Sequence, residues 1–226
     1  NALICSKLVE IPKIVGRDRA GPLAGIIRLM RDRNFGILVI ASGLFNMGQY
    51  NFFTYLTSFM RAAVQASQEI ASLPLGLAQA SSAVGRIGWG ALSDTVFKGR
   101  RKGLTALICL AAAVFFVTMS AVGSVWGAVA GIVIAMLLGL TIASWASLMQ
   151  TMAIESVAPE HSGSSIGYTT IGTASGAMIG PPLFGAVIDA TGSFAEGWLV
   201  TAAIIAAGAV LLTYGFSEKT TPMTAP

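Results

Sequence analysis

Residues 85–102 of the chain read GRIGWGALSDTVFKGRRK and separate two long hydrophobic stretches. The segment holds one carboxylate, on Asp94, and four cations between Lys98 and Lys102. Charged residues are costly in the lipid core of a membrane, and basic residues gather beside membrane spans on the cytoplasmic side. We therefore expect a short cytoplasmic loop here, whose position orients the hydrophobic stretches on either side.

The composition is that of a membrane protein. Of the 226 residues, 54% are hydrophobic and only 11% are charged, and the mean hydropathy is +0.75. A soluble domain has roughly 25% charged residues. The net charge of +4 favours contact with anionic lipid over nucleic acid, because the cations flank hydrophobic stretches. The two cysteines, Cys5 and Cys109, indicate neither a metal site nor a disulfide framework.

Hydrophobic segments of this chain are long enough for the ~20 residues that span a bilayer as a helix. There are six of them, at residues 35–60, 70–93, 103–122, 125–150, 164–187 and 195–216. We expect a six-helix transmembrane bundle over residues 34–217. Residues 1–33 are expected to be a cytoplasmic loop in which Pro22–Arg33 forms an amphipathic helix on the membrane surface, with a solvated turn as the alternative. Residues 218–226 are expected to be a cytoplasmic tail.

The cations predict the orientation. Twelve of the fourteen Lys and Arg residues fall where six alternating helices would place them on one side of the membrane. The other two are Arg61, on the opposite side, and Arg86, inside a helix. This asymmetry predicts that both ends of the chain are cytoplasmic. We expect a multi-pass protein of the plasma membrane, which in a bacterium is the inner membrane.

Polarity sorts the segments into two kinds. The third and sixth are apolar nearly all round, as is typical of lipid-facing helices, whereas the other four carry polar stripes. The stripes of the first two are formed by Asn46, Gln49, Tyr50, Asn51, Gln79, Ser82 and Arg86, and those of the fourth and fifth include Trp145 and Tyr168. Amides and hydroxyls in lipid need water, a ligand or another helix. Four striped helices and two apolar ones therefore predict half of a solute cavity.

Three motifs resemble the Major Facilitator Superfamily. Gly90-Ala-Leu-Ser-Asp94 followed by Lys98-Gly-Arg100-Arg101-Lys102 resembles the loop signature between helices 8 and 9 of that family. Pro159-Glu-His-Ser-Gly163 resembles the turn before helix 11, and Gly176-Ala-Met-Ile-Gly180-Pro181-Pro182-Leu-Phe-Gly185 resembles helix 11. The resemblance covers nearly the whole chain.

The resemblance implies a fold and a partner. The chain would be the C-terminal half of the transporter, helices 7–12, built as two inverted three-helix repeats and paired with an N-terminal six-helix half. Gly90, Asp94, Arg100, Arg101 and Lys102 would form a gating motif whose carboxylate meets a helix N-terminus of the other half, where the helix dipole favours an anion. A loop that only sets topology is the weaker alternative.

Arg86 is expected near the membrane midplane. It lies eight residues before Asp94, or about 12 Å along a helix. An intramembrane charge is a functional hypothesis by default. Oxalate/formate and monocarboxylate transporters of the family carry an Arg at a similar position, which implies a carboxylate substrate. A structural Arg satisfied by backbone carbonyls is an equally good interpretation.

Arg86 would be joined in the substrate site by residues from all four striped helices. They are Asn46, Gln49, Tyr50, Gln79, Trp145 and Tyr168. Hydrogen bonding between helices is the alternative for the amides, and ordinary packing is the alternative for the two aromatic residues. Gly176, Gly180 and Gly185 with Pro181 and Pro182 predict close helix contact and a kink, which is a structural role.

The sequence thus predicts a secondary transporter that moves a small organic anion by alternating access, with protons as a candidate coupling ion. The alternatives are a drug/proton antiporter and, less favoured, a membrane scaffold or sensor. No cofactor or metal is expected, since His161 has no partner ligand in the sequence. Gly163–Gly167 matches G-x-S-x-G formally, but it lies at a loop-to-membrane-helix junction, so we do not expect an enzyme.

Overall fold

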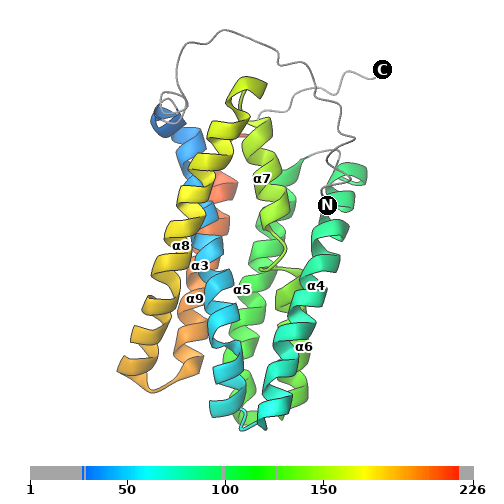
Figure 1. Cartoon of the computed structure of the whole chain (residues 1–226), viewed down its shortest axis with the longest axis vertical. Coiled ribbons are helices and arrows are strands. Elements are labelled where there is room, and N and C mark those ends of the chain that lie inside the picture. The colour runs from blue at the N-terminus through cyan, green and yellow to red at the C-terminus, as the bar shows by residue number, and fades with distance from the viewer. Residues whose placement is uncertain (1–26, 28, 98–99, 126, 219–226) are drawn as a thin grey trace, which may run out of the picture.

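The structure is a computed structural model that describes residues 27, 29–97, 100–125 and 127–218 (Figure 1). Most of the predicted loop 1–33 lies outside the described residues, which include only residues 27 and 29–33 of its predicted amphipathic helix. The tail beyond Glu218 and the positions of Lys98 and Gly99 in the charged loop lie outside them as well. The statements below concern the described residues.

The described residues form an all-α bundle whose helices run roughly along one axis, with no strand among them (Figure 1). The elements are α3 Arg33–Ala62, α4 Gln68–Thr95, α5 Arg101–Val125, α6 Gly127–Leu140, α7 Ala146–Glu155, the 3₁₀ turn Pro159–His161, α8 Ser162–Thr191 and α9 Phe194–Gly215. The predicted fold class, an all-α membrane bundle, is confirmed.

The helix ends follow from local chemistry. The side chain of Asp32 accepts from the amides of Asn34 and Phe35 and so caps α3. Ser67 and Ser193 cap α4 and α9 in the same way. Gly192 ends α8 in the left-handed region at φ 69°, which a residue with a side chain adopts at a cost.

One predicted span differs from the structure. Residues 125–150 were expected to form a single helix, but α6 ends at Leu140 and α7 begins at Ala146, with a turn over residues 141–145 between them. By length and hydropathy, three of the described helical stretches qualify as membrane spans: Arg101–Val122, Pro159–Thr191 and Phe194–Gly215. The polar stripes of α3 and α4 lower the mean hydropathy of these two helices. The break after Leu140 leaves α6 and α7 too short to qualify.

The helices pack as two three-helix units with equivalent contacts. α3 packs along α8 and α9, while α6 packs along α4 and α5, and α5 packs along α9. Exchanging α3, α4 and α5 with α6–α7, α8 and α9 turns this set of contacts into itself. That exchange is what a pair of three-helix repeats requires.

Glycine allows the two equivalent pairs to approach closely. A Cβ on Gly176 of α8 would overlap the carbonyl oxygen of Gly43 on α3, and a Cβ on Gly139 of α6 would overlap that of Ala78 on α4. Lipid tails are as apolar as the helix surfaces, so the hydrophobic effect does not drive helices together within a membrane. Membrane helices associate instead through close packing of this kind. The predicted close-contact glycines Gly176 and Gly180 both lie against α3.

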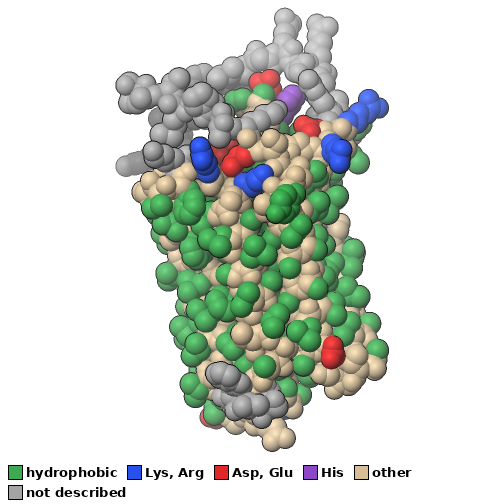
Figure 2. All heavy atoms as spheres, turned by 180° about the vertical axis from the view of Figure 1, so that it is seen from behind, with side chains coloured by type: hydrophobic (Ala, Val, Ile, Leu, Met, Phe, Trp, Pro, Cys, Tyr) green, Lys and Arg blue, Asp and Glu red, His purple; other side chains and the backbone are tan. Residues whose placement is uncertain are grey.

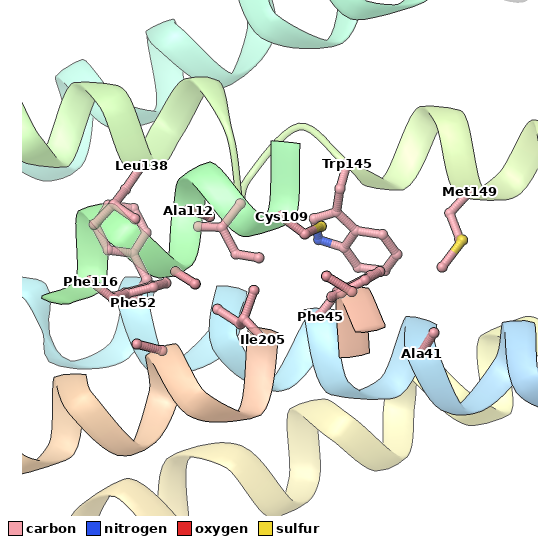
Figure 3. Packing of buried hydrophobic residues seen from close by; sticks show 14 of the residues in the cluster. Ala41, Phe45, Phe52, Cys109, Ala112, Phe116, Leu138, Trp145, Met149 and Ile205 are labelled. Atoms are coloured by element: carbon pink, nitrogen blue, oxygen red, sulfur yellow. The ribbon is translucent and has the colours of Figure 1, made fainter. Parts of the chain in front are cut away.

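Aromatic residues fill the centre of the bundle. Phe45 of α3 is fully buried against Trp145, which sits at the break between α6 and α7, while Phe52 of α3 and Phe116 of α5 are buried together near Leu138 of α6 (Figure 3). Further along the bundle, the rings of Phe116 and Trp198 stack at 5.6 Å. Burying large apolar rings contributes most of the packing energy of such a core.

We predict that Gly176→Ala destabilises the bundle, by about 1–3 kcal/mol, because the new methyl group overlaps the α3 backbone. Gly88→Ala is the matched control, since nothing lies within 4 Å of a Cβ built on Gly88. There the gain in helix propensity, roughly 1 kcal/mol, should leave stability unchanged or higher. Thermal unfolding of the two variants in detergent measures the difference, and equal melting temperatures would contradict the prediction.

Candidate functional site

The break between α6 and α7 has a local cause in hydroxyl side chains. Ser144 donates its hydroxyl to Leu140 O, the carbonyl that its own amide would bind in a continuous helix, and its amide turns to Thr141 O at 3.1 Å. The hydroxyl of Thr141 donates to Leu137 O at 2.8 Å. Side-chain hydroxyls that compete in this way loosen the helical ladder. Residues 141–145 therefore form a turn inside the bundle.

One face of α4 supplies donors to this turn. Ser82 Oγ donates to Ala143 O at 2.8 Å, Arg86 Nη2 donates to the same oxygen at 3.2 Å, and Trp89 Nε1 donates to Leu140 O at 2.6 Å. The three residues recur at positions i, i+4 and i+7, which lie on one helical face. Gly85, between them, brings α4 so close that a Cβ would lie 2.9 Å from Leu140 O. We call Ser82, Arg86 and Trp89 the α4 donors.

The contact with Ala143 O uses only one of the hydrogen-bond donors of Arg86. Its side chain is exposed, on a face of α4 where Ile87 is also 77% exposed. A guanidinium has several N–H donors, and Nη2 alone is bound to Ala143 O. No carboxylate of the described residues forms an ion pair with Arg86; the printed pairs belong to Arg101. The remaining donors of Arg86 have no protein acceptor among the described residues.

Two of the predicted site residues meet directly. Trp145 is 1% exposed, and its Nε1 donates to Gln49 Oε1 of α3 at 2.9 Å. Its ring meets Phe45 edge to face, with centroids 5.5 Å apart (Figure 3). Trp145 is the last residue of the turn, and the carbonyl of Ala143 in the same turn binds Arg86, so the turn contacts both Gln49 of α3 and Arg86 of α4.

The other predicted residues have different surroundings. Asn46 is half-buried and donates to Thr173 O of α8 at 2.7 Å, which is a bond between helices. Tyr168 stacks on Phe35 near the start of α3, with centroids 5.8 Å apart, and so lies away from Arg86 along the bundle. Tyr50 and Gln79 are exposed.

Asn51, predicted to line the cavity, is instead buried at 1% exposure. Its amide meets Thr201 Oγ1 of α9 at 3.1 Å. The amide orientation that satisfies both neighbours places its nitrogen on Gly180 O of α8, at 2.8 Å. On the next turn of α3, Tyr55 donates its hydroxyl to Pro181 O at 2.9 Å. The prediction failed because spacing along α3 does not reveal that the helix is covered by both α8 and α9 at Asn51.

Helix α8 continues through Pro181 and Pro182. Each proline lacks an N–H, so two carbonyls of the preceding turn have no helical donor. Gly185 follows and faces the ring hydroxyl of Tyr55, which would lie 2.8 Å from its Cβ. The predicted kink residues therefore pack against Asn51 and Tyr55 of α3.

Charged side chains gather at one end of the bundle, above flanks that are mainly hydrophobic (Figure 2). There Arg101 forms a two-pronged pair with Glu155, through Nε at 3.0 Å and Nη2 at 2.9 Å. Its Nη1 reaches Asp94 at 2.9 Å. Bidentate pairing fixes a guanidinium more strongly than a single contact. Arg101 therefore joins the ends of α4 and α7 to the start of α5.

The segment after α9 is tied to the same end. Glu218 Oε1 accepts from the backbone amides of Arg101 at 2.8 Å and Lys102 at 3.3 Å, which caps the start of α5. Lys102 Nζ donates to Phe216 O at 2.6 Å. Asn34 and the backbone of Ser217 bond to each other in both directions, at 3.0 Å and 2.6 Å.

Only some of the predicted gating residues take part in the contacts at this end. Asp94, Arg101 and Lys102 take part in these contacts, and the side chain of Asp94 stays 63% exposed. Arg100 is exposed, and Gly90 has open space around it. Sequence reasoning missed Glu155 and Glu218. Their signal was available, because each follows a hydrophobic segment at the end where the cations lie.

The fold and the charged end define a class: a helical membrane bundle of two three-helix units with a carboxylate–guanidinium cluster at one end. The sequence profile of the Major Facilitator Superfamily matches residues 38–226, so the chain belongs to that family. No curated protein sequence matches the chain. The crystal structure of a variant of the E. coli fucose:proton symporter FucP is similar, with a TM-score of 0.70 at 20% identity. The likeness covers 88% of this chain and 46% of that chain, so this chain spans about half the length of that one.

We predict that Trp89→Phe loosens the turn over residues 141–145, because Leu140 O loses its 2.6 Å donor from α4. Losing such a bond costs about 1–3 kcal/mol where the acceptor stays buried. Hydrogen exchange of the amides at 141–145 should become faster. Trp198→Phe is the control, since its buried Nε1 has no partner among the described residues and it lies in another part of the core. Equal exchange at the turn in both variants would count against the α4 donors.

We predict that Glu218→Ala lowers the melting temperature, because two amides at the start of α5 lose their acceptor. The loss of a helix cap costs about 0.5–2 kcal/mol. Glu160→Ala, at an exposed position in the 3₁₀ turn, is the control and should leave the melting temperature unchanged. A melting temperature for Glu218→Ala equal to that of the parent protein would refute the cap.

Proposed function

We propose that the chain is the C-terminal half of a secondary transporter that moves a small organic anion of the monocarboxylate type by alternating access. The observation that carries this proposal is Arg86, an exposed guanidinium on α4 with a single donor engaged by Ala143 O. A carboxylate binds a guanidinium through two parallel hydrogen bonds. The free donors of Arg86 supply that geometry without displacing a carboxylate of the protein.

The surroundings of Arg86 support the assignment. It lies nine residues before the end of α4, or about 14 Å along the helix. That depth places it near the middle of a bilayer whose core is ~30 Å thick. Gln49 and Trp145 are bonded to each other, and Trp145 lies two residues after Ala143, whose carbonyl binds Arg86. An anion bound at this depth would be held by Arg86 and oriented by polar groups of α3 and the turn.

The charged end supports alternating access. Arg101 links three helix ends through Asp94 and Glu155, and the outer part of Asp94 stays exposed. We propose that this end is cytoplasmic and that Asp94 closes against a helix N-terminus of an N-terminal half when the transporter faces outward. The protein would then lie in the plasma membrane with both chain ends inside.

Protons are the coupling ion that we propose. FucP, which shares the fold, is a proton symporter by its description. Every carboxylate of the described residues lies near a helix end, at Asp32, Glu69, Asp94, Glu155, Glu160, Asp189, Glu196 and Glu218. A midplane proton site would therefore belong to the other half or to the substrate itself.

We predict that Arg86→Gln in the full-length transporter lowers carboxylate uptake by at least about tenfold, since a bidentate charged contact is worth more than 1.4 kcal/mol. Arg86→Lys should restore part of the binding but not the two-pronged geometry. Arg61→Gln is the control, because Arg61 ends α3 at the opposite end of the bundle. Uptake of labelled acetate into proteoliposomes measures the effect. Unchanged uptake with Arg86→Gln would overturn the anion assignment, and proton-driven efflux of cationic drugs would favour an antiporter.

A further inference from the structure

An open groove lies at the charged end of the bundle, between the start of α5 and the end of α9. Its volume is about 600 Å³, within the ~300–1,000 Å³ of small-molecule sites. It is lined by Phe97 and Arg100 of the loop before α5, by Lys102 and Gly103 of α5, and by residues 214–218 at and after the end of α9. We call this space the α5–α9 groove.

The groove lies at the boundary between the hydrophobic spans and the charged end. The membrane-spanning stretch of α5 begins at Arg101, and that of α9 ends at Gly215. Both helices therefore leave the hydrocarbon core of a bilayer at the level of the groove. Tyr214, in its lining, is 86% exposed, and tyrosines gather at membrane interfaces because the ring is apolar and the hydroxyl polar. The groove thus lies at the depth of phospholipid headgroups.

The charges of the groove favour an anion. Arg100 is exposed, and its side chain forms no hydrogen bond or ion pair with the described residues. Lys102 is half-buried, and its ammonium donates one of three N–H groups to Phe216 O at 2.6 Å. Glu218, the one carboxylate among the described lining residues, already accepts from the backbone amides of Arg101 and Lys102. Two cations therefore remain with donors for a ligand.

Below the groove, both helices carry exposed apolar side chains. On α5 these side chains recur three or four positions apart after Gly103, at Leu107, Leu110, Val114 and Val117. On α9, exposed Val210 lies four residues before Tyr214. Such spacing places each set on one helix face, and Gly103 and Tyr214 show that both faces reach the groove. Because α5 and α9 pack along each other, the two apolar stripes run side by side away from the cations.

We propose that the α5–α9 groove binds the headgroup of an anionic phospholipid, with Arg100 and Lys102 at its phosphate and its acyl chains along the apolar stripes of α5 and α9. The cations favour an anionic over a zwitterionic lipid, because each adds attraction to net negative charge. The stripes favour a lipid over a free phosphate, because they provide apolar surface for its chains. This site lies apart from Arg86 and does not depend on the transported substrate.

Lipid binding to the purified full-length transporter in detergent tests the site. Native mass spectrometry measures the affinities for dioleoyl phosphatidylglycerol, dioleoyl phosphatidylcholine and glycerol 3-phosphate. We expect phosphatidylglycerol to bind most tightly. Arg100→Gln should weaken its binding about fivefold, the effect of one cation near an anionic lipid surface, and Lys102→Gln should weaken it to a similar extent. Arg100 is exposed, so its variant should fold whatever happens at Lys102.

Arg61→Gln is the matched control, because it removes the same charge at the opposite end of the bundle, outside the groove. Its affinity for phosphatidylglycerol should equal that of the parent protein. Equal affinities for the two lipids, or an equal loss with Arg61→Gln, would overturn the proposal, since they indicate general surface attraction. Glycerol 3-phosphate that binds as tightly as the lipid would also overturn it, in favour of a soluble phosphate ester.

Absence of phosphatidylglycerol binding overturns the proposal as well, as would be found if another part of the transporter covered the groove. None of these outcomes depends on carboxylate uptake. The lipid site and the anion assignment of Arg86 can therefore fail separately.

Discussion

The arrangement of the site depends on one constraint: a backbone carbonyl exposed by a broken helix in a membrane must receive a hydrogen bond. The turn between α6 and α7 leaves Leu140 O and Ala143 O without their helical donors, and Ser82, Arg86 and Trp89 of α4 supply replacements. The break therefore determines where α4 docks and at which depth Arg86 is held. A cation that satisfies a carbonyl with one N–H keeps the others for a ligand, so structural and substrate-binding roles of Arg86 are compatible.

The same requirement recurs in the equivalent helix pair, α3 and α8. Where α6 and α4 meet at the break, α8 and α3 meet at Pro181 and Pro182, and Asn51 and Tyr55 place polar groups at Gly180 and Pro181. In both pairs glycine lets the backbones touch. In these two pairs, the break after α6 and the prolines of α8 are thus each packed against a neighbouring helix that carries polar side chains.

At the charged end, Arg101 and Glu218 connect elements far apart in sequence. Arg101 binds Asp94 and Glu155 with its side chain while its amide is bound by Glu218. Because these groups are partly exposed, each pair alone contributes little to stability. Their joint effect is geometric, since the start of α5 is bonded to the ends of α4 and α7 and to the segment after α9. The contact that we propose between Asp94 and an N-terminal half would involve the same cluster.

The sequence by itself determined the class of protein and five of the six helical segments, because hydropathy and charge sum over ~20 residues. It also indicated the family, through the motif from Asp94 to Lys102. It also placed Arg86 inside a helix. Only the tertiary structure decided that 141–145 is a turn, that Asn51 is buried, that Tyr168 stacks on Phe35, and that Glu155 and Glu218 complete the charged end. The physical reason is range: each of these outcomes depends on a hydrogen bond or ring contact with a distant helix. The hydroxyl of Ser144 competes with the Ser144 amide for Leu140 O, and a hydropathy average does not detect such competition. Its effect depends on the α4 donors that bind the same turn.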